Sequence, residues 1–141
     1  MINAAITLLR KKGLKPTQQR LAIYQALMTS RDHPHAQKIY RKVRKKHVTI
    51  SLNTVYNTLE AFKRAGLIGS VKVLHDESAR YDPTVDPHNH IVCMKCKKVT
   101  DLFEKKLLRI PTPSEIGGEF KIMGYRVEFF GYCRVCAGAS P

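Results

Sequence analysis

Apolar side chains recur at helical spacing in four stretches of the first 66 residues. They lie within residues 2–9, 21–28, 36–43 and 52–62, where apolar positions are separated by three or four residues. Thr17 and Ser51 precede the second and fourth stretches and are typical N-caps, and Gly66 lies where a helix often ends in the left-handed conformation. The pattern therefore predicts four helices, the fourth running from just after Ser51 to just before Gly66.

The polarity pattern changes after Gly66. A mostly apolar run at residues 67–74 and a shorter stretch at 79–81 flank the polar residues 75–78, which is the pattern of a β-hairpin. Helices followed by such a hairpin describe a winged helix-turn-helix. We predict an α+β protein with a winged helix-turn-helix domain at residues 1–82 and a small α/β domain at residues 83–141.

The fourth predicted helix carries hydrogen-bonding side chains near its N-terminus, away from its apolar stripe. These are Asn53, Thr54, Tyr56 and Asn57, and such side chains suit base edges and thymine methyl groups in a major groove. The periodicity fits a second interpretation equally well, in which Tyr56 packs on a neighbouring helix and Asn57 is only solvated. The basic run at 41–46 would attract phosphate and add salt dependence rather than sequence selectivity.

Positive charge is concentrated in the first half of this 141-residue chain. Residues 1–70 carry 14 Lys and Arg against 2 Asp and Glu, a net charge of +12, whereas residues 71–141 carry 11 against 9. A folded half with this charge repels itself, so a polyanionic partner, first of all nucleic acid, explains it better than a solvated surface. The chain has no membrane-length apolar run and no secretion-signal pattern at its start, so we expect a cytoplasmic protein without a membrane partner.

All four cysteines lie in the second half, in two C-x-x-C pairs. Cys93 and Cys96 form the first pair, and Cys133 and Cys136 form the second. Each pair presents two thiolates from one turn, and two such turns complete a tetrahedral Zn²⁺ site. Disulfides are disfavoured without a secretion signal, and a thioredoxin-like redox pair lacks its βαβ setting. We therefore predict structural zinc, which would also stabilise a domain too small for a large core.

A second group of candidate ligands consists of histidines and carboxylates. His88 and His90 fall in a predicted strand, where alternate residues share a face. If the first C-x-x-C pair forms a hairpin turn, His88 pairs with Asp101 on that face, although a shift of one residue would turn Asp101 away. Asp82 and His33 could approach from the first half. Such a set suits Fe²⁺ or Mn²⁺ better than thiolates do, and the alternative is that each is a surface residue.

Several motifs, in their order and spacing, resemble the ferric uptake regulator (Fur) superfamily over nearly the whole chain. They are GLKPTQQR at 13–20, HP at 33–34 with IY at 39–40, SLNTVY at 51–56, AGLI at 65–68, RYD at 80–82, HNHIVC at 88–93 and GYC at 131–133. The resemblance implies a homodimeric repressor that binds double-stranded operator DNA, with a C-terminal dimerisation domain. It also implies structural zinc at the four cysteines, a regulatory metal at the domain junction, and a DNA contact at Lys15.

Within the superfamily the chain is most similar to the peroxide-stress regulators (PerR type). Their regulatory ligands, which hold Fe²⁺ or Mn²⁺, fall on His33, Asp82, His88, His90 and Asp101. Iron-sensing members commonly have Glu at the two Asp positions and Arg at position 57, where this chain has Asn. The resemblance thus implies peroxide sensing, in which iron chemistry adds oxygen to His33 or His88, the oxidised ring ligates poorly and the DNA is released.

Two departures from the family pattern lead to further expectations. Pro87, Asn89 and Val127 offer none of the ligands that build an additional site in some iron regulators, so we expect no extra regulatory site. Pro111 and Pro113 interrupt the long helix of the dimerisation domain, which should be short or displaced.

Several alternatives remain open at this point. His35 lies two residues from His33 and is the main competing ligand, although the His-Pro motif favours His33; His47 and His75 should be surface residues. The protein could also be an iron-responsive repressor that reads metal occupancy only, or a zinc-stabilised nucleic-acid-binding module without a sensor. A non-haem iron enzyme could use the H-x-H pair and a carboxylate as a facial triad, but the winged-helix pattern and the basic half argue against an enzyme.

Overall fold

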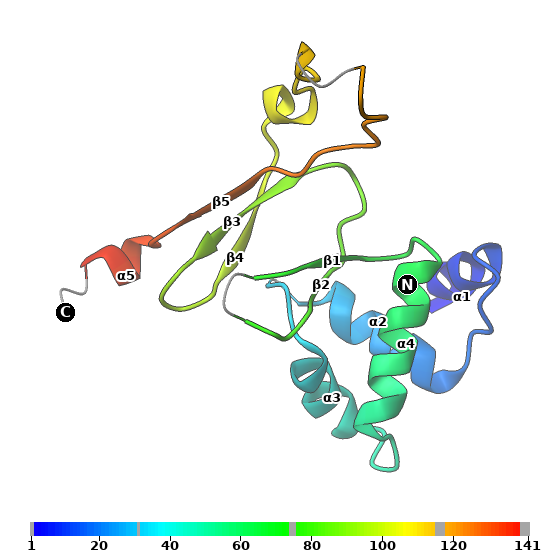
Figure 1. Ribbon diagram of the computed structural model, residues 1–141. Helices are drawn as coiled ribbons and strands as arrows, with labels where there is room; N and C mark the ends of the chain where they lie inside the picture. Colours follow the sequence, from blue (N-terminus) through cyan, green and yellow to red (C-terminus); the bar gives the residue numbers. More distant parts are fainter. Residues whose placement is uncertain (1, 31, 74–75, 115–117, 139–141) are drawn as a thin grey trace. The chain divides into compact units, whose positions relative to one another are not determined.

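The computed structural model describes residues 2–30, 32–73, 76–114 and 118–138 (Figure 1). The chain forms two compact units, which we call the N-terminal unit, Met1–Val85, and the C-terminal unit, Asp86–Pro141. The division falls three residues after the expected boundary at residue 82, because Thr84 still donates its backbone N–H to Asp82 Oδ1 (2.7 Å). In the described part of the chain, no helix has the length and apolar character that a bilayer crossing requires.

Four helices make up most of the N-terminal unit, which confirms the prediction from the apolar pattern. They are α1 (Ile2–Lys11), α2 (Gln18–Met28), α3 (Ala36–Arg44) and α4 (Leu52–Arg64). Both predicted N-caps are present: Thr17 Oγ1 accepts a hydrogen bond from the N–H of Arg20 (3.3 Å), and Ser51 Oγ accepts one from the N–H of Thr54 (3.0 Å). These side chains satisfy N–H groups that the first turn of a helix leaves without a partner.

The apolar faces of the four helices meet in one core. Its largest fully buried helical side chains are Leu9, Ile23, Leu27, Ile39, Val55, Leu59 and Phe62. At the end of α4, Gly66 adopts a φ of +64° and the N–H of Leu67 bonds back to the carbonyl of Phe62 (2.9 Å). This is a Schellman motif, and it places Leu67 in the same core as Phe62.

A short antiparallel pair, β1 (Gly69–Val71) and β2 (Arg80–Asp82), follows α4 and forms the predicted wing. It is shorter than predicted, and Leu74 and His75 lie outside the described residues. The register places Gly69 opposite Asp82. The N-terminal unit is therefore a winged helix-turn-helix in which the candidate ligand Asp82 is the last residue of the second wing strand.

Tyr81 connects the wing to the helices. Its side chain is buried, its N–H donates to the carbonyl of Pro34 (3.0 Å), and its hydroxyl donates to Glu60 Oε1 on α4 (3.2 Å). Burial, followed by the charge of Glu60, raises the pKa of Tyr81. The hydroxyl therefore stays protonated and remains a donor. Tyr81 thus links β2 both to α4 and to the segment that precedes α3.

The C-terminal unit contains a three-stranded sheet in the order β4-β3-β5. Strand β3 (Asn89–Cys93) is antiparallel to β4 (Val99–Leu102) and parallel to β5 (Glu128–Gly131). A one-turn 3-10 helix, η1 (Lys105–Leu108), follows β4, and α5 (Arg134–Gly138) follows β5. As predicted, no long helix forms in the described residues of this unit: η1 ends before Pro111 and Pro113.

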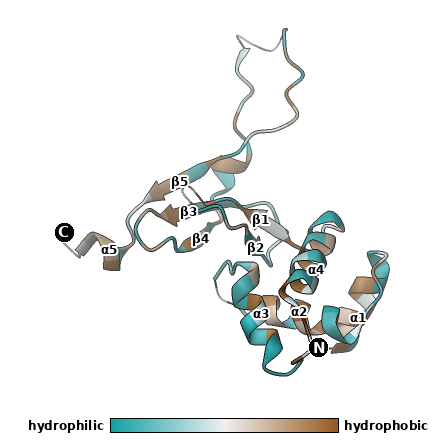
Figure 2. Cartoon of the chain, turned by 60° about the horizontal axis from the view of Figure 1, so that its bottom comes forward, coloured by the Kyte–Doolittle hydropathy of each residue, from teal (hydrophilic) through white to brown (hydrophobic). Residues whose placement is uncertain are grey.

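The two units differ sharply in their cores. Among the described residues, seventeen buried apolar side chains lie in the N-terminal unit, whereas only Val92, Cys93 and Val99 are buried in the C-terminal unit. Conversely, twelve of the sixteen large apolar side chains that are exposed in the described ranges belong to the C-terminal unit. Figure 2 shows this apolar character along β3, β5 and α5. The C-terminal unit thus has little core of its own.

Candidate metal centres and nucleic-acid interface

The two C-x-x-C pairs converge at one end of the C-terminal sheet. Cys93 ends β3 and Cys96 lies in the turn to β4, while Cys133 follows β5 and Cys136 lies in α5. Because β3 and β5 are parallel, with Cys93 opposite Gly131, both pairs reach the same end of the sheet. All four sulfur atoms lie within 4.8 Å of one another, the Sγ atoms of Cys96 and Cys133 are 3.8 Å apart, and none of the four cysteines forms a disulfide.

The local electrostatics favour thiolates at this cluster. The N–H of Cys133 donates to Cys93 Sγ (3.4 Å), and this bond, followed by one from the N–H of Cys96, lowers the pKa of Cys93 to about 6. The pKa of Cys133 is also lowered, chiefly by the N–H of Cys136. The pKa of Cys136 is raised to about 12, chiefly by its side-chain hydrogen bond to Cys133. The Cys136 thiol therefore keeps its proton beside the other three sulfur atoms. A bound dication would take the place of that proton, and four soft donors at this spacing fit tetrahedral Zn²⁺.

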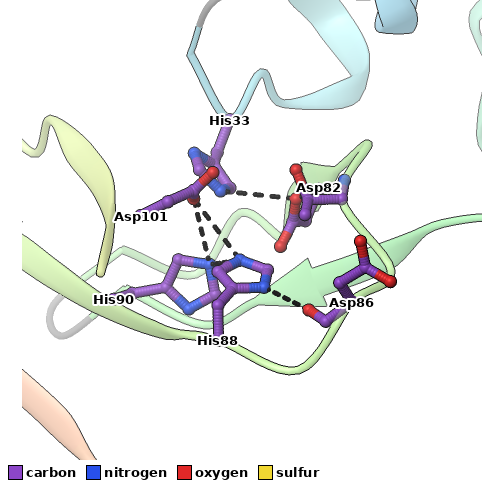
Figure 3. A network of polar contacts seen from close by, with 7 residues as sticks. His33, Asp82, Asp86, His88, His90 and Asp101 are labelled. Carbon is purple, nitrogen blue, oxygen red and sulfur yellow. Dashed lines mark hydrogen bonds and ion pairs between the residues drawn. The ribbon is translucent and has the colours of Figure 1, made fainter. Parts of the chain in front are cut away.

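The histidine and carboxylate candidates of the C-terminal unit also converge (Figure 3). Asp101 Oδ1 lies 3.4 Å from His88 Nε2 and 3.6 Å from His90 Nε2, and the two Nε2 atoms are 2.9 Å apart. Three ligand atoms thus meet on one side of the β3–β4 hairpin.

The predicted strand register is wrong by two residues. Asp101 lies opposite His90 rather than His88. The turn is longer than the predicted one: the N–H of Cys93 bonds to the carbonyl of Lys98 (2.9 Å), and Lys97 adopts a left-handed φ of 60°. Side chains alternate with period two, so a shift of two residues leaves Asp101 on the expected face.

The ring of His88 is fixed by a backbone contact. Its Nδ1 lies 2.7 Å from the carbonyl oxygen of Asp86, as Figure 3 shows. A carbonyl only accepts hydrogen bonds, so this contact favours a proton on Nδ1, and the lone pair of Nε2 would then be available to a metal ion. Such support is typical of ligating histidines, whose second nitrogen donates to a carbonyl or carboxylate. No sequence pattern could indicate it, because every residue has a backbone carbonyl.

The remaining two candidates pair within the N-terminal unit. His33 and Asp82 are both buried, and His33 Nε2 lies 3.6 Å from Asp82 Oδ1. The segment before α3 carries His33, and the hydrogen bond from Tyr81 to Pro34 holds that segment against β2. Two residues 49 positions apart in the sequence are thereby brought together.

His35, the competing ligand, has a structural role instead. Its Nδ1 accepts a hydrogen bond from the N–H of Lys38 (3.1 Å) and so caps α3. Desolvation, followed by the charges of Arg80 and Arg41, lowers the pKa of His35 and keeps the ring neutral, as the cap requires. Histidine is not among the usual N-cap residues, which is why the sequence pattern did not predict this cap.

The side chains predicted to face DNA are not equally exposed. Asn53, Asn57 and Lys15 are exposed, and Arg20 holds the backbone of Lys15 by donating to its carbonyl (3.1 Å). Thr54 is half-buried, and its hydroxyl lies 2.8 Å from that of Ser51.

Tyr56 is also half-buried and packs against the core, so its ring is only partly available, as one of the two interpretations held. The basic run at 41–46 is mostly exposed. Within it, Lys42 donates to the carbonyl of Ala26 (3.1 Å) and to Thr29 Oγ1 (2.8 Å) at the end of α2. Lys42 therefore has a structural role in the packing of α3 against α2.

Comparison with known families identifies this arrangement. The model of the ferric uptake regulator family matches residues 11–130. The chain belongs to this family. Members of the ferric uptake regulator family are metal-responsive transcription regulators rather than enzymes, which agrees with the expectation from the basic winged helix.

Its relatives include peroxide-responsive regulators. PerR of Staphylococcus epidermidis, a peroxide-responsive repressor, is 34% identical over 135 residues, which are 96% of this chain and 89% of that protein. The structure of PerR from Streptococcus pyogenes, described as a basis for peroxide sensing and gene regulation, matches with a TM-score of 0.55 at 29% identity over 96% of this chain and 92% of that one. Fur of Helicobacter pylori, described as having three functional metal-binding sites, shares the fold with a TM-score of 0.75 at 20% identity, over 99% of this chain and 94% of that chain.

Proposed function

We propose that this member of the ferric uptake regulator family is a metal-dependent repressor that responds to hydrogen peroxide and binds operator DNA as a homodimer. The observation that carries the proposal is the donor set: His88, His90 and Asp101 converge in the C-terminal unit, and His33 pairs with Asp82 in the N-terminal unit. The similarity to the peroxide-responsive repressor of Staphylococcus epidermidis supports the same reading.

The two groups together would supply the ligands of one regulatory ion. Three imidazoles and two carboxylates are a nitrogen and oxygen set that suits Fe²⁺ or Mn²⁺, whereas the cysteine cluster suits Zn²⁺. An ion held by residues from both units would favour whichever conformation brings those residues together. Metal occupancy would then raise DNA affinity through its different affinity for the two conformations.

The histidines would carry the peroxide response. Bound Fe²⁺ would supply the redox chemistry that converts peroxide into an oxidant, which Mn²⁺ would not. His33 and His88 offer the imidazole rings that would gain an oxygen atom, and Asp86 already holds the second nitrogen of His88. An oxidised ring is a poorer ligand, so it would loosen the set and release the DNA.

DNA binding would depend on two kinds of contact. Asn53 and Asn57 of α4 are exposed and would contact base edges, together with Thr54 and the available edge of Tyr56. Lys15 would contact phosphate or the minor groove and would contribute to salt dependence. A homodimer would present two such helices, and the exposed apolar side chains of the C-terminal unit are the surface that a second copy would cover.

The decisive test combines DNA binding with peptide mass. Zinc-loaded protein is bound to operator DNA with Mn²⁺, with Fe²⁺, and with Fe²⁺ followed by peroxide, and peptides that contain His33 or His88 are then weighed. We expect release only in the third case, with a gain of one oxygen on one of these peptides. His47→Ala serves as a matched control, because His47 lies outside the ligand set, and it should behave like the unchanged protein.

The same experiment separates the proposal from its closest competitor. An iron-responsive repressor that reads occupancy only would release DNA with a chelator and keep its histidines unmodified after peroxide. DNA affinity that ignores added Fe²⁺ and Mn²⁺ in both the unchanged protein and the His33→Ala variant would reject metal regulation altogether.

A further inference from the structure

Phe103 makes an unusual contact for an exposed aromatic side chain. It follows β4 directly, and 61% of its surface is exposed. Nevertheless its ring stacks on the imidazole of His88, with ring centroids 5.1 Å apart and an interplanar angle of 25°. The solvent-exposed ring thus covers one face of a candidate metal ligand.

His88 needs such support because its backbone is not held by the sheet. Strand β3 begins at Asn89, so His88 lies just outside the strand. The hydrogen bond from Nδ1 to the carbonyl of Asp86 holds one edge of the ring (2.7 Å), but a contact at the edge constrains the plane of a ring less than a contact on its face. Stacking against Phe103 fixes that plane.

Both contacts help to direct Nε2 of His88. With Nδ1 turned to Asp86 and one face of the ring against Phe103, Nε2 is directed at His90 Nε2 (2.9 Å) and Asp101 Oδ1 (3.4 Å). The ring of His90 meets that of His88 edge-on, with centroids 4.5 Å apart at 67°, and leaves the Phe103 contact undisturbed. A ligand held in this orientation would lose less entropy when a metal binds.

We propose that Phe103 is a positioning residue for the regulatory metal, because its stacking holds the imidazole of His88 in the orientation that ligates. The inference rests on the proposed function, since it assigns Phe103 to the same site. Phe103 would act on the ion only through His88. Ring stacking of this kind contributes about 0.5–1.5 kcal/mol, which corresponds to an affinity change of about two- to tenfold.

The test compares three variants of the full-length, zinc-loaded protein. Phe103→Ala removes the stacked ring, Phe103→Tyr keeps it, and Phe120→Ala removes another phenylalanine of similar exposure, 64%, from the same unit. Mn²⁺ affinity is measured by titration, and zinc content and oligomeric state are measured alongside it. In parallel, ¹⁵N spectra of the histidine rings without Mn²⁺ report whether the His88 proton resides on Nδ1.

We expect Phe103→Ala to weaken Mn²⁺ binding about two- to tenfold, with unchanged zinc content, and to mix the two tautomers of His88. Phe103→Tyr and Phe120→Ala should retain both the affinity and the Nδ1–H tautomer. A general loss of structure would reduce zinc content and would not be rescued selectively by a second aromatic ring, so the tautomer and the rescue separate positioning from stability.

Two results would overturn the inference in distinguishable ways. If Mn²⁺ affinity falls in His88→Ala but is the same in Phe103→Ala as in Phe120→Ala, the role of Phe103 is rejected and the proposed function stands. If His88→Ala binds Mn²⁺ like the unchanged protein, the proposed ligand set fails and the role of Phe103 fails with it.

Discussion

Removing zinc from the cysteine cluster is expected to unfold the C-terminal unit and leave the N-terminal unit intact. The reason is the unequal distribution of buried apolar side chains. In the described residues of the C-terminal unit, Val92, Cys93 and Val99 are the only buried apolar side chains, and the four cysteines join the turn after β3 to the segment after β5. Without a cation, thiolates drawn to within 4.8 Å of one another would repel.

The magnitudes show why the metal decides the outcome. Complete burial of Val92 and Val99 contributes about 1.5–3 kcal/mol each, before any entropy is subtracted. Binding of structural Zn²⁺ contributes about 10–16 kcal/mol in small zinc domains. The loss of zinc therefore removes the larger contribution to the folding free energy. We expect the C-terminal unit to unfold completely rather than only to become more flexible.

Hydrogen exchange after treatment with a strong chelator measures this directly. Amide protection along β3 and β4 should disappear, whereas protection in α2 and α4 and the helical circular dichroism should persist, because the long helices all lie in the N-terminal unit. Cys96→Ser should reproduce the effect without a chelator. Thr100→Ala, an exposed change in the same hairpin, is the matched control and should leave protection unchanged. Persistent protection of β3 in zinc-free protein would refute the reasoning.

Two further predictions concern the N-terminal unit. Gly66→Ala should lower the stability of the N-terminal unit by about 1 kcal/mol, measured as a lower midpoint of urea unfolding. The cost comes from the backbone, because φ is +64° and the added Cβ meets only Lys12 Nζ, at an ordinary 3.8 Å. An unchanged midpoint would contradict this backbone cost. Asp76 accepts two hydrogen bonds from Arg80 (2.8 and 3.1 Å), which are the first cause of its lowered pKa. The pKa of Asp76 is lower in the folded than in the unfolded protein. The carboxylate therefore stabilises the fold at pH values above the unfolded-state pKa, and this contribution is lost as the pH falls through the folded-state pKa. Asp76→Asn should therefore cost about 0.5 kcal/mol near pH 7, reduced by solvent screening, and nothing in strong acid; equal midpoint shifts at both pH values would count against the ion pair.

The helices of the N-terminal unit could be predicted because their signals are local. Apolar spacing identifies the buried face of α4, Ser51 marks its start and Gly66 its end, and all three are confirmed. The convergence of the cysteines could also be predicted, since C-x-x-C turns have few other uses in such a chain. These features depend on residues near one another in sequence.

The errors and omissions involve backbone geometry or long-range packing. The hairpin register depends on a turn in which Lys97 adopts a left-handed φ, and nothing in a lysine predicts that conformation. The support of His88 by the Asp86 carbonyl and the Phe103 ring depends on segments that meet only in the folded unit. The exposure of Tyr56 could not be decided either, because periodicity alone does not show how far a ring at the edge of the buried stripe enters the core.

The unequal cores also bear on where a metal signal can act. A ligand that binds only the folded state at 100 times its dissociation constant adds about 2.7 kcal/mol of stability. That amount is small for a unit with seventeen buried apolar side chains and large for one with three, among the residues that the structure describes. His88, His90 and Asp101, and the zinc cluster, all lie in the unit with the small core. Gain or loss of an ion should therefore shift the conformational equilibrium of the C-terminal unit first, while the winged helix keeps its fold.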